Sequence, residues 1–221
     1  MGLMYLIDTL RLDPVASIKT GLRIVHFIGL ALGLGAATVL DLMILKFFIR
    51  GKVTSDQWHV FHFGSRIVNA GLILLWITGL GFLAYYSAFD PIRLGNEKVW
   101  AKMTIVLILT INGIFLHMAV LPKVKAQIGR SLLDGMSTGQ RSLFFASGAL
   151  SATSWYVPLL LGAMPQLNFV VPMTTILLAY ALLLTLALLA TQLVLLALGD
   201  DRRSELPSSL RDRSEPVMGL A

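Results

Sequence analysis

Residues 58–86, WHVFHFGSRIVNAGLILLWITGLGFLAYY, decide the fold class of this chain. From Ile67 onward the segment holds no charged residue. An apolar run of about 20 residues is long enough to cross a bilayer as a helix. The stretch therefore predicts a transmembrane helix. Its first turns carry ionisable side chains, and such groups inside a span usually mark a functional site.

Four further blocks of the same kind make the chain an integral membrane protein. Of its 221 residues 56% are hydrophobic and 14% are charged, whereas charged residues make up about 25% of ordinary soluble domains. We expect an all-α membrane fold of about five transmembrane helices, with a four-helix core and a C-terminal anchor helix. The predicted spans cover residues 21–48, 60–86, 100–121, 142–164 and 170–198.

The segments outside the spans suggest three regions. Residues 1–19 form an N-terminal interfacial segment, with a short helix that ends near Pro14. Residues 20–198 form the transmembrane helical domain. Residues 199–221 are charged and contain serine and proline, so we expect a disordered cytoplasmic tail. The longest connection, 122–141, is basic, and part of it is expected to form a surface helix.

Basic residues predict the orientation of the chain in its membrane. The 49–57 loop, the 122–141 loop and the tail lie on one side, and this side carries more Lys and Arg than the other. Because cytoplasmic loops are enriched in these residues, we expect the N-terminus outside and the C-terminus inside, in the inner (plasma) membrane of the cell. The net charge of +6 then reflects topology and lipid headgroups, and no nucleic-acid partner is expected.

The chain contains no cysteine. This excludes disulfides, iron–sulfur clusters, thiolate metal sites and c-type haem attachment. Three of the four histidines lie inside predicted spans. Nitrogen ligands without sulfur suit haem b, copper or zinc.

The predicted helix 60–86 carries a polar stripe. His62, Arg66, Asn69 and Trp76 recur at helical spacing. We expect this stripe to face the bundle interior, with residues 58–69 as the cytoplasmic half of a buried polar site. His62 is a candidate ligand and Arg66 a counter-charge, with Asp41 of the first span or a ligand carboxylate as its partner. His59, one turn earlier, is expected to be interfacial without a ligand role.

The first span places His26, Gly29 and Gly33 on one face. One interpretation is close helix packing of the Gly-x-x-x-Gly kind. The other is a flat cofactor that lies against the two glycines, with His26 as its ligand. The spacing alone does not choose between them.

The depths of the candidate ligands along their helices suggest two pairs. At about 1.5 Å of rise per residue, His26 lies ~9 Å and Lys102 ~3 Å inside the outer edge, a difference that a lysine side chain can span. His62 and His117 each lie roughly 6 Å from the inner edge by the same rise. Either pair, His26 with Lys102 or His62 with His117, can supply axial nitrogens to a haem iron or ligands to another metal.

Small residues mark the fourth predicted span, 142–164. Ser147, Ser151 and Ser154 recur at helical spacing, which favours tight helix packing with the hydroxyls bonded to the backbone.

The fifth span is mainly Leu, Ala and Thr. We expect it to act as a lipid-facing anchor or a subunit interface.

Three segments resemble HemJ-type protoporphyrinogen oxidases and their CopD-like relatives, over about residues 20–163. They are GLRIVHFIGLALGLGAATVLDLMILKFF (21–48), FGSRIVNAGLILLWITGLGFL (63–83) and WAKMTIVLILTINGIFLH (100–117). The resemblance implies a four-helix module that binds haem b, with His26 as an axial ligand and Lys102 as the proposed second one. The chain adds a fifth span to that module, and Asn112 stands where the family often has a histidine.

Three functions follow from these observations. The first is a protein binding one or two haem b groups through His26, His62, Lys102, His117 and Arg66, which performs electron transfer or HemJ-like oxidase chemistry with a tetrapyrrole or redox partner. The second is CopD-like transport of copper or another small cation. The third is a non-catalytic membrane subunit, whose polar stripe binds a partner helix or another copy of the chain.

Overall fold

The computed structural model describes residues 13–50, 54–131 and 135–204. Helices build the fold, and no strand occurs in these ranges. Five helices are long and apolar enough to cross a membrane. The predicted all-α membrane bundle is therefore confirmed.

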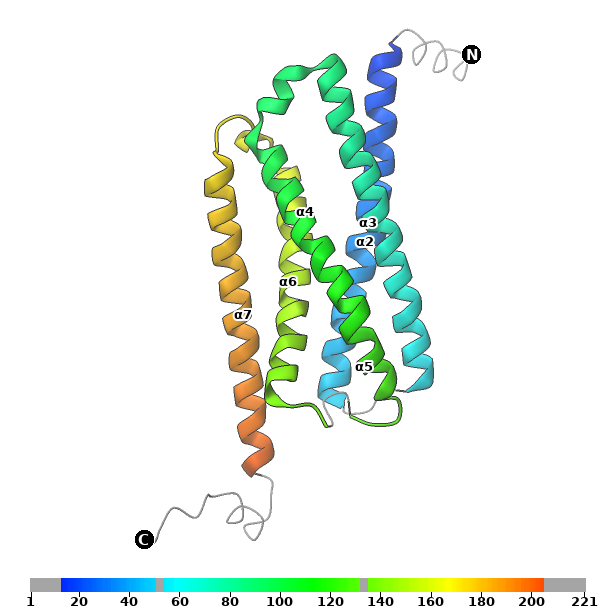
Figure 1. Ribbon diagram of the computed structural model, residues 1–221, viewed down its shortest axis with the longest axis vertical. Coiled ribbons are helices and arrows are strands. Elements are labelled where there is room, and N and C mark those ends of the chain that lie inside the picture. Colours follow the sequence, from blue (N-terminus) through cyan, green and yellow to red (C-terminus); the bar gives the residue numbers. More distant parts are fainter. Residues whose placement is uncertain (1–12, 51–53, 132–134, 205–221) are drawn as a thin grey trace.

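The chain runs up and down between the two ends of an elongated bundle (Figure 1). We name these the η1 end, where η1 and η3 lie, and the α5 end, where α5 and the start of α6 lie. The elements are α2 (Pro14–Arg50), α3 (Ser55–Phe89), η1 (Pro91–Gly95), α4 (Glu97–Phe115), η2 (Leu116–Val120), α5 (Leu121–Ala126), α6 (Thr138–Ala163), η3 (Pro165–Leu167) and α7 (Met173–Ser204).

The first helix begins at Pro14, where the sequence predicted that a short interfacial helix would end. Proline suits the first helical position, because its missing N–H has no intrahelical partner there anyway. Asp13 caps the helix by accepting a bond from the Ala16 N–H at 2.8 Å. Residues 14–19 thus belong to the first long helix, and residues 1–12 lie outside the described part of the chain.

Capping boxes fix two helix starts at the α5 end. Thr54 and Gln57 exchange side-chain bonds with each other's backbone N–H at the start of α3. Ser137 and Gln140 do the same at the start of α6. Each reciprocal pair satisfies backbone donors that the first turn of a helix leaves without partners.

The last helix is longer than expected. α7 continues to Ser204, so residues 199–204, predicted as the start of a disordered tail, are helical. Residues 205–221 lie outside the described ranges. Residues 122–126 of the 122–141 connection are helical, but they belong to α5, which continues α4 through η2 instead of forming the expected surface helix.

α2 and α3 form the closest helix pair, a hairpin in which the two backbones touch. A Cβ added to Gly71 would lie 2.4 Å from the Gly33 backbone nitrogen and 2.7 Å from the Gly29 carbonyl oxygen. Only glycine allows helices to approach so closely. The contact supports the close-packing interpretation of the two glycines in the first span.

α4, α6 and α7 form a second unit, with the serine stripe of α6 at its centre. Ser147, Ser151 and Ser154 are all buried, which confirms the tight packing predicted for this stripe. The Ser154 hydroxyl lies 2.8 Å from the hydroxyl of Tyr180 on α7. α7 therefore packs one face on α6, while large apolar side chains elsewhere on it are exposed.

Two apolar contacts join the hairpin to the second unit. Trp155 of α6 is 3% exposed, and its ring covers Gly33, where an added Cβ would lie 2.4 Å from it. At the α5 end, Phe61 of α3 packs in a buried cluster. The other buried members of that cluster are Val120, Val124 and Phe144.

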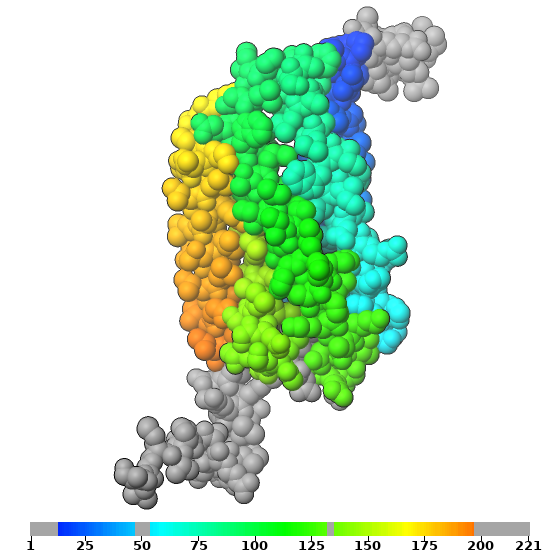
Figure 2. Space-filling model, in the orientation of Figure 1, coloured from blue at the N-terminus to red at the C-terminus, as the bar shows by residue number. Residues whose placement is uncertain are grey.

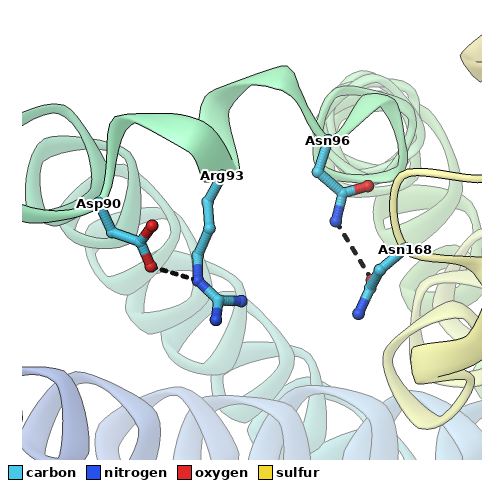
Figure 3. Close-up of polar contacts among 4 residues, drawn as sticks. All are labelled: Asp90, Arg93, Asn96 and Asn168. Atoms are coloured by element: carbon cyan, nitrogen blue, oxygen red, sulfur yellow. Dashed lines mark hydrogen bonds and ion pairs between the residues drawn. The ribbon is translucent and has the colours of Figure 1, made fainter.

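Polar contacts close the η1 end. Figure 3 shows Asp90 paired with Arg93, and the Asn96 side chain reaching across to Asn168 in the link between α6 and α7. The Asn96 amide donates to Asn168 Oδ1 at 3.2 Å. The side-chain oxygen of Asn96, Oδ1, also accepts a bond from the Lys98 backbone N–H at 3.2 Å, which caps α4.

The next two residues bind the ends of the neighbouring helices. Glu97 Oε2 accepts from the Met173 N–H at 2.6 Å, at the start of α7. Lys98 Nζ donates to the Met164 carbonyl at 2.9 Å, at the end of α6. Each charge matches the helix dipole that it faces. We call Asn96, Glu97 and Lys98 the η1-end clasp.

Candidate functional site

His26 of α2 is oriented by one hydrogen bond to α3. Its Nδ1 lies 2.8 Å from Thr78 Oγ1, and Thr78 Oγ1 donates its own proton to the Leu74 carbonyl at 2.7 Å. In the tautomer in which the Thr78 hydroxyl donates to the Leu74 carbonyl, His26 Nδ1 is the donor and Nε2 keeps its lone pair. Histidines that bind metals are commonly oriented in this way through the other ring nitrogen.

Lys102 of α4 is the nearest predicted partner of His26. It is half-buried and lies within electrostatic range of His26. No hydrogen bond joins the two side chains in the part of the chain that the structure describes. The role of this pair in binding a ligand stays a prediction.

Long side chains bridge the boundary between α3 and α4. Trp76 Nε1 donates to Thr110 Oγ1 at 2.9 Å, and a Cβ added to Gly79 would meet Met103 Sδ at 3.7 Å. These helices therefore meet through side chains, unlike α2 and α3. We call this boundary the α4 seam, and the residues that meet across it are Trp76 with Thr110 and Gly79 with Met103.

The glycines below His26 leave no room for a flat cofactor. A Cβ on Gly29 would lie 2.9 Å from Leu74 Cβ, and one on Gly33 would lie 2.4 Å from the Trp155 ring. Protein atoms already fill the surface on which the sequence interpretation placed a ring. A planar ligand of His26 would have to lie on the side of the imidazole away from these glycines.

The polar stripe of α3 points away from the bundle. His62, Arg66 and Asn69 are all exposed, so the expected burial is wrong for these three, whereas Trp76 is half-buried and bonds α4. The side chains of Arg66 and Asn69 make no ion pair or hydrogen bond within the described ranges. Asp41 is half-buried on α2 and does not pair with Arg66.

The inner histidines do not enclose a site. His117 is exposed in the π-helical turn η2, and His59 is exposed as expected. In the part of the chain that the structure describes, no group of three or more His, Cys, Asp or Glu residues is placed to hold a metal ion. The ligand roles of His62 and His117 stay predictions without a common pocket to support them.

A cavity of about 400 Å³ lies elsewhere, between α4, α6 and α7. Its wall is apolar apart from Asn112 and Ser147. The Asn112 amide donates to the Ser147 carbonyl at 2.9 Å. None of the predicted ligands lines this cavity.

The sequence did not single out Thr78, the residue that orients His26. Fifty-two positions separate the two residues, and a threonine in an apolar run is usually bonded to its own helix. Only the contact between α2 and α3 shows that this hydroxyl has a second partner. No protein-family model, curated protein or solved structure matches the chain, so the resemblance to HemJ-type and CopD-like proteins stays a prediction, and the site is argued from its own geometry.

Proposed function

We propose that the chain is a haem b-binding membrane protein whose haem iron His26 and Lys102 would hold. One observation carries the proposal: Thr78 orients the His26 imidazole through Nδ1, and the half-buried Lys102 of α4 lies within electrostatic range of that ring. An imidazole and an amine are nitrogen ligands that suit haem iron. When bound, haem supplies one-electron chemistry for electron transfer or for an oxidase reaction of the HemJ kind.

The residues around this pair have separate roles. Thr78 accepts the Nδ1 proton and fixes the ring plane of His26. Phe82 packs edge-on against the imidazole, with ring centroids 5.7 Å apart. The bond from Trp76 to Thr110 holds α3 and α4 at a fixed separation. Together they keep the ligand nitrogen in one position, which a bound metal requires.

The charges support one haem rather than two. Arg23 is exposed one turn before His26, where it can meet a propionate as a charge-assisted partner. Arg66, the other predicted counter-charge, is exposed on the outer face of α3. The exposed positions of His62 and His117 likewise favour the His26–Lys102 pair as the single site.

Absorption spectra of the purified protein, oxidised and reduced with dithionite, test the proposal. We expect a Soret band that shifts on reduction. His26→Ala should remove or strongly weaken it, and Lys102→Ala should change its position. His62→Ala and His117→Ala are matched controls and should leave it unchanged. A colourless folded protein from haem-replete cells, or an unchanged His26→Ala spectrum, would contradict the proposal.

Copper binding is the second candidate, and Met103 favours it. The Met103 sulfur reaches α3 within the α4 seam, beside Lys102, and thioether ligands select Cu(I). Elemental analysis separates the two functions. Iron at about one atom per chain supports haem, whereas copper that is lost in a Met103→Leu variant supports a copper protein.

A further inference from the structure

α3 presents polar side chains to the membrane. His62, Arg66 and Asn69 lie on its exposed face, with the small residue Ala70 beside them. We call these four residues the α3 stripe. In Figure 2, α3 lies at one edge of the molecule, and α7 lies at the opposite edge. None of the other described helices covers the stripe, because its members are exposed.

Two of these side chains lie well inside the membrane-spanning part of α3. Phe61 packs with Phe144 and Val124 at the α5 end, and the apolar run of α6 starts at the level of Phe144. At about 1.5 Å of rise per residue, Arg66 lies ~7.5 Å and Asn69 ~12 Å further into the bundle. A long arginine can reach back to the headgroups from that depth, but the short Asn69 side chain cannot.

Nothing within the described ranges satisfies these groups. The only ion pair among them joins Arg93 and Asp90 at the other end of α3. No hydrogen bond reaches the Asn69 amide from another described residue, whereas Asn112, the other intramembrane asparagine, is buried and bonded to α6. A polar amide in hydrocarbon needs a hydrogen-bond partner. The partner of Asn69 must therefore come from another molecule.

The arrangement of charge decides what that molecule is. In a symmetric dimer through this face, a two-fold axis along the membrane normal would place Arg66 against Arg66, and like charges repel. A lipid headgroup can pair with Arg66 but cannot reach Asn69. A transmembrane helix meets both demands, and Ala70 lets its backbone approach closely.

We propose that the α3 stripe binds a transmembrane helix of a different protein, one that carries a carboxylate opposite Arg66 and a hydrogen-bonding side chain opposite Asn69. The carboxylate neutralises the guanidinium inside the bilayer. The second group bonds the Asn69 amide one turn deeper. This docking surface lies on α3, away from the His26–Lys102 pair, so it does not depend on haem binding.

Designed peptides in phosphatidylcholine vesicles test the proposal with the full chain. One peptide is a polyleucine helix with a Glu and an Asn three residues apart, and the control peptide is all leucine. Energy transfer from a labelled chain measures association. We expect the Glu/Asn peptide to bind at least about tenfold more tightly than the control, a factor that a charge-assisted bond can supply.

Variants of the chain test whether the α3 stripe causes the preference for the Glu/Asn peptide. Asn69→Leu should reduce it about tenfold, and Arg66→Glu should reverse it in favour of a peptide with Lys in place of Glu. Thr185→Leu is the matched control, because Thr185 is exposed on α7 and its hydroxyl bonds the Ala181 carbonyl of its own helix at 2.8 Å. Thermal unfolding of each variant confirms that it folds, and removing an exposed amide from the membrane should not destabilise the chain.

Four outcomes would overturn the proposal. They are equal binding of the two peptides, an Asn69→Leu variant that keeps the preference, self-association of the chain through a crosslinker at Ala70, and loss of the preference when phosphatidylglycerol is added. The third outcome would assign the face to a second copy. The fourth would assign it to anionic lipid.

Discussion

The α2–α3 contact and the α4 seam are two ways of bringing membrane helices together. In the first, glycines let the backbones touch, with a Gly71 Cβ position only 2.4 Å from Gly33. In the second, side chains meet across the boundary, as Trp76 does with Thr110 at 2.9 Å. The first contact is closed to ligands and depends on residue size. In the second contact, polar bridges between side chains take the place of close backbone packing.

Replacing Trp155 should have the largest effect on this arrangement. Trp155→Ala removes the ring that joins α6 to Gly33, and truncating a buried tryptophan costs about 3–5 kcal/mol. Thermal unfolding in detergent micelles, followed by circular dichroism, measures the loss. Trp155→Phe, which keeps an aromatic ring, should lose less than Trp155→Ala. Equal stability of Trp155→Ala and the parent chain would show that the two units do not depend on this contact.

Widening the α2–α3 hairpin should have the second-largest effect on stability. Gly71→Ala places a Cβ against backbone atoms of Gly33 and Gly29, which cannot rotate away, and overpacking of this kind costs about 1–3 kcal/mol. Gly35→Ala is the matched control, because nothing lies within 4 Å of its added Cβ. The control should be neutral or slightly stabilising in the same unfolding measurement. If Gly71→Ala and Gly35→Ala had the same thermal stability, the backbone contact would contribute nothing to the free energy of unfolding.

The polar bridge of the α4 seam should show the smallest change. Thr110→Val removes the acceptor of the Trp76 indole, and hydrogen bonds between membrane helices contribute about 0.6 kcal/mol on average. Thr104→Val is the control, because the Thr104 hydroxyl bonds only the Trp100 carbonyl of its own helix. The fluorescence of Trp76 should shift in the first variant alone. A destabilisation as large as that of Gly71→Ala would reverse the ranking of the two contacts.

The sequence predicted the five spans because their length and apolarity are set by the bilayer, not by neighbouring residues. It also predicted that His62, Arg66 and Asn69 share a face, since that follows from the helical repeat. It could not predict which way the face points. In water the apolar face of a helix turns inward. In a membrane the surroundings on both sides of α3 are apolar, so the helical repeat of polar residues does not show which face points into the bundle. The expectation of a buried stripe was wrong for this reason.

Depth along the helices predicted that His26 and Lys102 lie at similar levels, because this needs only the rise of a helix and the edges of the spans, and the two lie within electrostatic range of each other. Thr78 was not predictable, because its bond to His26 depends on how α2 and α3 rotate against each other. That rotation follows from the glycines, whose contacts the sequence left open between packing and ligand binding. Whether a glycine packs against a helix or faces a ligand depends on which atoms meet across the interface, and the sequence of a single helix does not contain that information.

The η1-end clasp has a consequence for the order in which the chain is assembled. Glu97 and the Met173 N–H that it binds are 76 positions apart in the sequence. When α4 enters the membrane, the ribosome has not yet made the start of α7. The Lys98 ammonium can bind the Met164 carbonyl once α6 is complete, whereas the Glu97 carboxylate meets the Met173 N–H only when the last helix arrives. Assembly of the bundle therefore finishes at the η1-end clasp.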